Sequence, residues 1–348
     1  MTPVHLDEAL SRYTQLGIYA AMLFYAAAFV VLSMNLARAA STKSKVRATA
    51  GRLETVGIWL TVVAVLFQAV GVIGRGIAVQ RVPWANMYEF TITSTFVAVA
   101  IFAVAQFFRK DIRFIGVLIT GFVTLALGLA TTLWYVQAKS LMPALQSYWL
   151  LIHVTVAILG TAFFNIAAAL SIAYLFKTAG WVQNPPKKLG GNKVFKTFKR
   201  MLGLFPTEER LEQTSYRFNI IGFILWSFTL IAGAIWAERA WHRYWGWDTK
   251  EVWTFIIWTI YAGYLHANAT RGWSGKRSAW LVVVGFAAIL FNFTIVNIFF
   301  KGLHVYSGLK SPESLLPKPV LGSAPDVPAT TRCARAKPQV AATLPQLA

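Results

Sequence analysis

The sequence predicts an all-α integral membrane protein, a polytopic bundle of about eight transmembrane helices with both termini outside. Three observations lead to this expectation. Of the 348 residues, 57% are hydrophobic and only 13% are charged, which is typical of a polytopic membrane protein and not of a soluble enzyme. Long apolar stretches recur along the chain, and basic residues gather in alternate connections between these stretches.

Eight apolar stretches are long enough to cross a hydrocarbon core as helices, which takes about 20 residues each. Backbone groups in lipid must be paired within the membrane, and these stretches are too long and too uniformly apolar to be the strands of a barrel. The expected spans lie near 15–37, 55–75, 88–108, 112–134, 149–176, 217–236, 250–268 and 279–300.

Two tails are expected to flank the transmembrane domain, which we place at 15–309. Residues 1–14 lack a basic region and a small-residue cleavage site, so we expect a short external N-terminal tail and not a signal peptide. Residues 310–348 are rich in Pro, Ala and Ser without a regular period, which predicts a disordered external tail. The single cysteine, Cys333, lies in this tail, so any metal chemistry must use histidine.

The positions of the basic residues predict the orientation, because Lys and Arg are retained on the cytoplasmic side of a membrane. Of the 33 Lys and Arg residues, 20 lie in the connections 38–52, 109–113, 177–217 and 271–277. The connection between the sixth and seventh spans is therefore expected outside. Retention and anionic lipid headgroups account for the net charge of +20, so we expect membrane lipid and no nucleic acid as a partner. The basic segment 184–213 fits an interfacial amphipathic helix or a solvated linker.

A tryptophan-rich stretch at 236–258 holds six of the chain's 14 tryptophans. Within it, Asp248 followed three residues later by Glu251 predicts a capping box at the start of the seventh span. One or two indoles at a membrane interface would be ordinary. At this density, rings such as Trp241, Trp245 and Trp247 suit a large planar aromatic ligand, which they would hold as a shelf.

Three histidines add a possible metal site. His153 lies one turn inside the outer end of the fifth span, and His304 lies just past the outer end of the eighth. Either one alone fits an ordinary interfacial residue, but the two beside the tryptophan-rich stretch fit an axial pair for a haem iron. His266 lies about 27 Å beyond Asp248 at 1.5 Å per helical residue. It is therefore expected near the cytoplasmic side, where an ionisable residue in a span is a functional candidate.

These residues resemble the tryptophan-rich WWD signature of the cytochrome c assembly family. The signature is carried by "WAERAWHRYWGWDTKEVWTFIIWTIYAGYLHANAT", and the resemblance extends to "RVPWANMYEF", "SYWLLIHVTVAILGTAFF" and "GLHVYSG". The chain is most similar to the system II component called CcsA, CcsB or ResC in different lineages. The resemblance covers most of residues 55–308. It implies that haem b moves outward across the membrane and is attached to Cys-X-X-Cys-His motifs of apocytochrome c.

The resemblance also implies roles for particular residues. His153 and His304 match the two external histidines that ligate haem, and Trp241, Trp245, Trp247 and Asp248 match the WWD haem shelf. His266 matches the histidine of an inner haem site whose other ligand comes from a partner. The implied partners are a second system II membrane protein of the ResB or CcsB-like type, apocytochrome c and a thiol-reducing thioredoxin-like protein. The implied location is the cell membrane, or the thylakoid membrane in a photosynthetic organism.

The chain departs from the family pattern at two positions of the signature. His242 and Thr249 stand where the family usually has Gly and Pro. His242 adds an imidazole beside the shelf, where packing, contact with a propionate or ligation is open to it. Basic residues could balance the haem propionates or simply be hydrated interfacial cations. These are Arg239, Arg243, Lys250 and Arg81.

The resemblance implies a subunit of a cytochrome c synthase in which no residue of this chain need act as the nucleophile. The cysteine sulfur arrives on the apocytochrome, so catalysis would consist mostly of positioning. A system I relative that loads haem onto a chaperone is one alternative, although eight spans favour the system II component. The other alternative is a permease with Asp248, Glu251 and His266 as a proton relay. No acid lies in the middle of a span and no inverted repeat is evident, which disfavours a permease.

Overall fold

The computed structural model describes residues 8–137, 147–300 and 302–304. The chain divides into two compact units, Met1–Leu309 and Lys310–Ala348. All of the described residues belong to the first unit. The predicted C-terminal tail at 310–348 lies outside them, as do the first seven residues of the predicted N-terminal tail.

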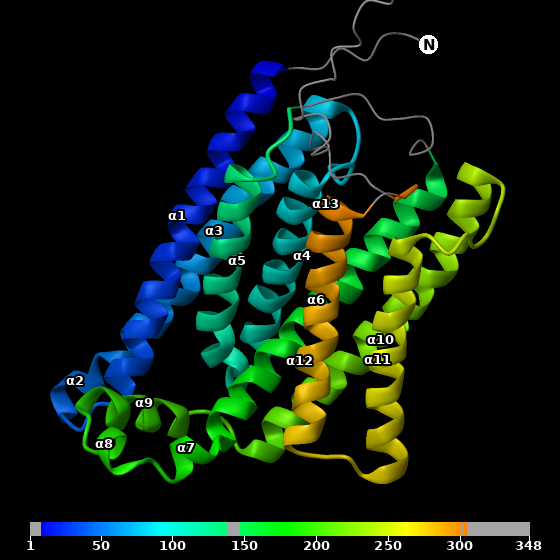
Figure 1. Cartoon of the computed structure of the whole chain (residues 1–348). Helices are drawn as coiled ribbons and strands as arrows, with labels where there is room; N and C mark the ends of the chain where they lie inside the picture. The colour runs from blue at the N-terminus through cyan, green and yellow to red at the C-terminus, as the bar shows by residue number, and fades with distance from the viewer. Residues whose placement is uncertain (1–7, 138–146, 301, 305–348) are drawn as a thin grey trace, which may run out of the picture. The chain divides into compact units, whose positions relative to one another are not determined.

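All regular secondary structure in the described part of the first unit is helical, which confirms the all-α expectation (Figure 1). The long helices are α1 (Glu8–Ala39), α3 (Ala50–Val79), α4 (Met87–Phe108), α5 (Gly116–Thr132), α6 (Tyr148–Thr178), α10 (Glu208–Trp241), α11 (Thr249–Arg271) and α12 (Lys276–Phe291). Short helices lie between them or follow them: α2 (Ser44–Ala48), η1 (Lys110–Ile115), α7 (Gly180–Gln183), α8 (Lys187–Gly190), α9 (Lys193–Gly203), the π-helix η3 (Asn292–Val296) and α13 (Asn297–Phe299).

Seven helical stretches in the described part are long and apolar enough to cross a membrane. They correspond to seven of the eight predicted spans, and the chain is a multi-pass membrane protein. The predicted span 250–268 coincides with α11, which has 23 residues but is not among the seven. The reason lies in its sequence, because Thr, Tyr, His and Asn interrupt its apolar residues. Most helices also extend several residues beyond the predicted spans, and α10 begins at Glu208 instead of 217.

The loops that carry the basic residues lie together at one end of the bundle (Figure 1). Ion pairs connect them, from Arg113 to Glu54 at 3.7 Å and from Arg210 to Asp111 at 3.1 Å. Glu212 in turn accepts a hydrogen bond of 2.6 Å from the backbone N–H of Gly275. Because successive long helices run in opposite directions, the tryptophan-rich connection between α10 and α11 lies at the other end.

The helix α9 forms within the basic segment at the first of these ends. Its N-cap residue Asn192 accepts from the backbone N–H of Val194, and it buries Phe195 and Leu202. The lysines at 193, 196 and 199 stay on its exposed side. This amphipathic pattern is typical of a helix at a membrane surface, and it favours the interfacial interpretation of the segment over the solvated linker.

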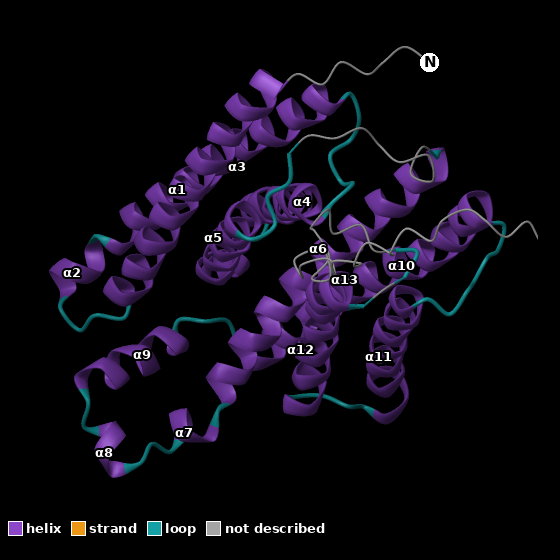
Figure 2. Ribbon diagram, turned by 45° about the horizontal axis from the view of Figure 1, so that its top comes forward, coloured by secondary structure: helices purple, strands orange, loops and turns teal. Residues whose placement is uncertain are grey.

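Helices α1 and α3 pack side by side over their length (Figure 2). A Cβ atom on Gly17 would lie 3.1 Å from the backbone nitrogen of Gly71, so the two backbones approach where neither residue has a side chain. Farther along, the Tyr25 hydroxyl donates to Oε1 of Gln68 at 2.7 Å, and Gln68 Nε2 donates to the Ile92 carbonyl at 2.9 Å. This buried network joins α1, α3 and α4 and leaves one wall of the bundle rigid.

Helices α6 and α10 form the second closely packed pair, and α11 and α12 lie against them (Figure 2). The rings of Phe164 and Tyr261 stack with centroids 3.7 Å apart. Indole N–H groups of Trp226 and Trp258 donate across the α10 and α11 contact, to the Thr254 carbonyl and the Ser227 hydroxyl. Trp258, which belongs to the tryptophan-rich stretch, is therefore a packing residue.

Labelling of single cysteines should test both the orientation and the crossing of α11. In a Cys333→Ser background, Arg243→Cys precedes α11 and Ser274→Cys follows it, and both positions are exposed. We expect a membrane-impermeant maleimide to label Arg243→Cys in intact cells and Ser274→Cys only after permeabilisation. Labelling of both from one side would mean that α11 does not cross, and the reverse pattern would mean that the predicted orientation is wrong.

Candidate functional site

A cavity of about 540 Å³ opens within the bundle toward the end that holds the tryptophan-rich connection. Residues of α4, α5, α6, α10, α11 and α12 line its walls, which are mainly apolar. Its volume lies in the range of sites that bind sizeable organic ligands. The lining residues that matter below are Trp84, His153, Trp236, Trp245, Lys250 and His304.

His153 is held in one orientation by a backbone contact. It lies in the second turn of α6, whose N-cap Ser147 accepts from the backbone N–H of Trp149. Its Nδ1 lies 2.9 Å from the carbonyl oxygen of Thr229 on α10. A carbonyl oxygen can only accept, so Nδ1 carries the proton and Nε2 keeps the lone pair that a metal would bind. A Cβ atom on Gly233 would lie 2.7 Å from His153 Cε1, so this ring needs a glycine opposite it.

His304 is placed by the carboxylate of Asp248. Oδ2 of Asp248 accepts from the backbone N–H of Leu303 at 2.6 Å, and it lies 3.5 Å from Nδ1 of His304. A Cβ atom on Gly302 would lie 2.5 Å from the same oxygen, so the carboxylate is in close contact with the backbone of this segment. The carboxylate faces Nδ1, and Nε2 is again the nitrogen left for a ligand.

The indole of Trp236 joins the two histidines. Its centroid lies 6.0 Å from that of His153, with the rings nearly parallel, and 5.6 Å from that of His304, with the rings at 70°. Trp236 is 1% exposed. Trp241 completes the packing, with its centroid 4.7 Å from that of His304. We refer to His153, Trp236 and His304 as the His–Trp cluster.

The capping box predicted at Asp248 and Glu251 is confirmed. Oδ1 of Asp248 accepts from the Lys250 N–H at 2.9 Å, and Oε2 of the buried Glu251 accepts from the Gly246 and Asp248 amides at 2.8 and 3.0 Å. Partial burial acts to raise the pKa of Asp248, but the contacts from His304 and the backbone amides outweigh it and hold this pKa well below its usual range. Asp248 is therefore a fixed negative charge.

The remaining predicted site residues divide into those at the cavity and those at the surface. Trp245 lines the cavity, whereas Trp247 is 76% exposed and adopts a left-handed φ of 58°. His242 is also exposed and ends α10 with a φ of 56°. The side chain of Arg239 is 68% exposed and pairs with Glu238, and Arg243 is exposed above Gly246. The structure thus brings Trp241 and Trp245 to the His–Trp cluster or the cavity, but not Trp247, Arg239, Arg243 or His242.

His266 lies far from the cluster. It is exposed on α11, one turn before Thr270, whose hydroxyl donates to the His266 carbonyl. It follows the N-cap of α11 by 18 residues, so the separation along the axis is about 27 Å. The cavity walls do not include it. Its exposure leaves the ring accessible from outside the chain.

Sequence reasoning missed several residues that shape the site. Trp236 was counted in the tryptophan-rich stretch, but its place between two histidines depends on how α6, α10 and α12 pack. Thr229 contributes only a backbone carbonyl, so its side chain gives no signal. The spacing of Thr229, Gly233 and Trp236 along one face of α10 would have indicated a helix side that faces a single neighbour.

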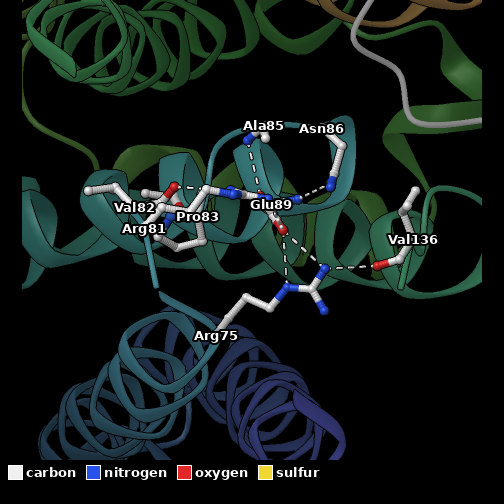
Figure 3. A network of polar contacts seen from close by, with 9 residues as sticks. Arg75, Arg81, Val82, Pro83, Ala85, Asn86, Glu89 and Val136 are labelled. Carbon is white, nitrogen blue, oxygen red and sulfur yellow. Dashed lines mark hydrogen bonds and ion pairs between the residues drawn. The ribbon is translucent and has the colours of Figure 1, made fainter. Parts of the chain in front are cut away.

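A buried ion network fixes the cavity wall that carries Trp84 (Figure 3). Glu89 is fully buried and accepts from Nε of Arg75 at 3.1 Å and from Nη1 of Arg81 at 2.7 Å. It also accepts from the Ala85 amide at 3.0 Å, and Arg75 donates to the Val136 carbonyl at 2.9 Å. The carboxylate of α4 therefore holds the 81–85 segment, and with it Trp84, against the bundle.

The fold and site together define a polytopic α-helical membrane protein that has a histidine-bearing cavity near one membrane face. Residues 84–304 match the family described as Cytochrome C assembly protein. The chain belongs to this family, and it serves cytochrome c biogenesis. The matched region begins at Trp84 and ends at His304, so it spans the whole cavity.

Curated relatives support this assignment over most of the chain. The chain is similar to the cytochrome c biogenesis protein CcsA of Gloeobacter violaceus, with 32% identity over 303 residues that cover 74% of this chain and 88% of the relative. It is 38% identical over 180 residues to the CcsA of Prochlorococcus marinus, where the match covers 49% of this chain and 57% of that protein.

A solved structure shows the same fold. It is that of the cytochrome c haem lyase CcmF, with a TM-score of 0.54 and 16% sequence identity. The match covers 82% of this chain and 46% of that chain. At this identity the likeness concerns the helical fold alone.

Removing the charge of Glu89 should destabilise the protein strongly, because the buried guanidinium of Arg75 and the partly buried guanidinium of Arg81 would both lose this counter-charge. For Glu89→Gln we expect a loss of about 3 kcal/mol or more. Glu54→Gln is the matched control, since its ion pair with Arg113 spans 3.7 Å and both side chains are partly exposed, and it should cost less than about 1 kcal/mol. Thermal unfolding of both purified variants in detergent measures the difference. Equal effects would show that the buried network does not stabilise the fold.

Proposed function

We propose that the cavity binds haem b as a substrate and presents it at the outer face for attachment to Cys-X-X-Cys-His motifs of apocytochrome c. The observation that carries this proposal is the His–Trp cluster. Two imidazoles from distant parts of the chain lie on one indole at the cavity wall. Nδ1 of His153 is hydrogen-bonded to a carbonyl oxygen, and Nδ1 of His304 lies at an ion-pair distance of 3.5 Å from Oδ2 of Asp248. Histidine ligands of metals have this kind of support.

The residues present fit an iron that arrives with its own equatorial ligands. Among the described residues, no group of three or more His, Cys, Asp or Glu could hold a bare metal ion. Two imidazoles are sufficient for a porphyrin-bound iron, because they supply the axial positions. The apolar aromatic walls and the volume of about 540 Å³ suit a planar macrocycle of this size.

In this proposal the chain positions haem and protects it, and contributes no nucleophile. Axial ligation by His153 and His304 would saturate the iron, while Trp236 and Trp245 would pack beside the macrocycle and limit water. The thioether bond forms when a cysteine sulfur of the apocytochrome adds across a haem vinyl group. The chain would thus act as a subunit of a system II synthase, and its contribution to the rate would come from orientation.

The proposal extends to the remaining predicted residues. Trp241 supports His304 by direct ring contact, and Asp248 holds the His304 segment in place. Trp247, Arg239 and Arg243 lie at the exposed rim, where an indole and two cations could meet an incoming apocytochrome or an outer propionate. The chain would reside in the cell membrane, or in the thylakoid membrane of a photosynthetic organism.

We further propose that His266 belongs to an inner haem site that a partner completes. Its ring is exposed in the last turns of α11, the helix that leads into the basic connection 271–277. A second ligand would have to come from outside this part of the chain, and a ResB or CcsB-like membrane protein is the proposed source. A thioredoxin-like protein would keep the cysteines of the apocytochrome reduced, since only a free thiol can add to a vinyl group.

The alternatives are less well supported by the geometry. A proton relay through Asp248 and Glu251 is disfavoured, because the carboxylates of both accept backbone hydrogen bonds that fix the start of α11. A system I protein that loads haem onto a chaperone would use the same cavity. Covalent cytochrome formation with the reconstituted partner separates that alternative from the synthase.

Haem ligation by the cluster histidines predicts a distinct spectrum. Purified protein should show the absorption of a b-type haem with two histidine ligands, and His153→Ala with His304→Ala should abolish it. Each single variant should be partly restored by exogenous imidazole, which can fill the vacated axial position. His242→Ala is the control and should keep the wild-type spectrum, because His242 is exposed outside the cavity. A double variant with an unchanged spectrum would refute the ligand pair.

Separate inner and outer sites predict different responses to added haem. With the partner and an apocytochrome co-expressed, His266→Ala should lower covalent cytochrome, and haem supplied to the outer face should restore it. His304→Ala should stay defective when haem is plentiful, because the outer ligand itself is missing. Thr259→Ala, another exposed position on α11, serves as the control. The division into two sites fails if His266→Ala behaves like wild type without added haem, or if haem alone rescues His304→Ala.

A further inference from the structure

Lys250 is a cation on the cavity wall, at a position where a positive charge is unfavourable. It is the second residue of α11, in the first turn beyond the N-cap Asp248. The amide groups of a helix N-terminus carry partial positive charge, which disfavours a cation in this turn. Lys250 nevertheless points to the segment after α12, where its Nζ donates to Oδ1 of Asn297 in α13 at 2.6 Å and to the Asn292 carbonyl in η3 at 3.2 Å.

The ammonium group of Lys250 has no carboxylate in contact among the described residues. An ammonium has three donors, and the two acceptors in η3 and α13 are uncharged. The nearby acids are already engaged, because Asp248 binds the Leu303 and Lys250 amides and Glu251 binds the Gly246 and Asp248 amides. A cation withdrawn from bulk water is costly unless an anion pairs with it.

Asn292 places a second polar side chain, beside Lys250, at the same wall of the cavity. This residue is 6% exposed and lines the cavity, yet its Oδ1 is buried without a hydrogen-bond partner in the part of the chain that the structure describes. It begins the π-helical turn η3, and Asn297 follows directly after that turn. A π-turn within an α-helix is frequently found at a functional site.

We propose that Lys250 and the side-chain amide of Asn292 form the subsite that takes a carboxylate group of the cavity's occupant. Asn297 orients the lysine, since its Oδ1 accepts from Nζ while its Nδ2 donates to the Phe293 carbonyl. Lys250 supplies the counter-charge, and the amide of Asn292 can turn its N–H groups toward the anion. This inference rests on the proposed function, in which the occupant is haem and the carboxylate is a propionate. It assigns the carboxylate contact inside the cavity to Lys250 and not to Arg239 or Arg243, which are exposed and do not line the cavity.

The subsite would also orient the ligand. His153 and His304 fix the iron but leave the macrocycle free to rotate about the axis through the two imidazoles. A carboxylate bound at the start of α11 removes that freedom and selects which edge of the macrocycle faces the opening. For a reaction at the vinyl edge, that choice decides whether the reacting carbon atoms are accessible.

A comparison of haem with its dimethyl ester tests the subsite, because the ester keeps the macrocycle and iron and lacks the carboxylates. The full-length protein in detergent is titrated with each, and the ratio of the two dissociation constants is taken for each variant. Wild type should bind haem about 10-fold or more tightly than the ester, as expected for a charge-assisted contact. Lys250→Met should reduce the ratio to about 1, whereas Lys250→Arg should keep most of it.

The control measurements distinguish failure of the carboxylate subsite from failure of the proposed haem site. Lys276→Met removes an exposed cation at the opposite end of α12 and should leave the ratio at the wild-type value, whereas Asn292→Leu should lower it. Because each ratio is taken within one variant, a smaller folded fraction affects both ligands alike. Equal binding of haem and ester by wild type would overturn the subsite and leave the haem site intact. The subsite would also be overturned if Lys250→Met kept the wild-type ratio of the two dissociation constants. No binding of either ligand by wild type would overturn the proposed function itself.

Discussion

The geometry of the site depends on the carboxylate of Asp248, which holds two parts of the chain that are far apart in sequence. One oxygen accepts from the first turn of α11, and the other accepts from the Leu303 amide beyond α13 and faces His304. Because this carboxylate also caps α11, moving it would remove the cap, which typically costs about 1 kcal/mol. His304 follows the last helix of the described bundle, and this contact gives it a fixed position.

The opposite side of the site depends on close packing between α6 and α10. Thr229, Gly233 and Trp236 lie on one face of α10, and each meets His153 in a different way: by a backbone carbonyl, by the absence of a side chain, and by a nearly parallel ring. The helix thereby fixes both the rotation and the protonated nitrogen of the imidazole. Trp236 also contacts the ring of His304, so one indole of α10 positions both histidines.

Much of the fold could be predicted because membrane helices leave a strong local signal. Apolar length located seven spans, the alternating basic loops predicted which connections lie together, and the spacing of Asp248 and Glu251 predicted the cap of α11. Two histidines that the sequence indicated, His153 and His304, line one cavity in the structure, and their role as ligands stays a prediction. What could not be predicted depends on how helices pack. Nothing local in the sequence distinguishes Trp236, which contacts both histidines, from Trp247, which points to solvent.

The low hydropathy of α11 has two sources. Its first turns carry Lys250, Glu251 and Thr254, which line the cavity, and Tyr261 and Tyr264 lie farther along its buried face. A helix with these groups could not stand alone in lipid, because each polar atom there would need a partner. Within the bundle, backbone amides, the asparagines at the π-turn and the indoles of α10 provide such partners near its outer end. The polar residues at the start of α11 thus both weaken its transmembrane signal and make the cavity polar at one wall. A ligand with an apolar plane and a charged edge suits such a cavity.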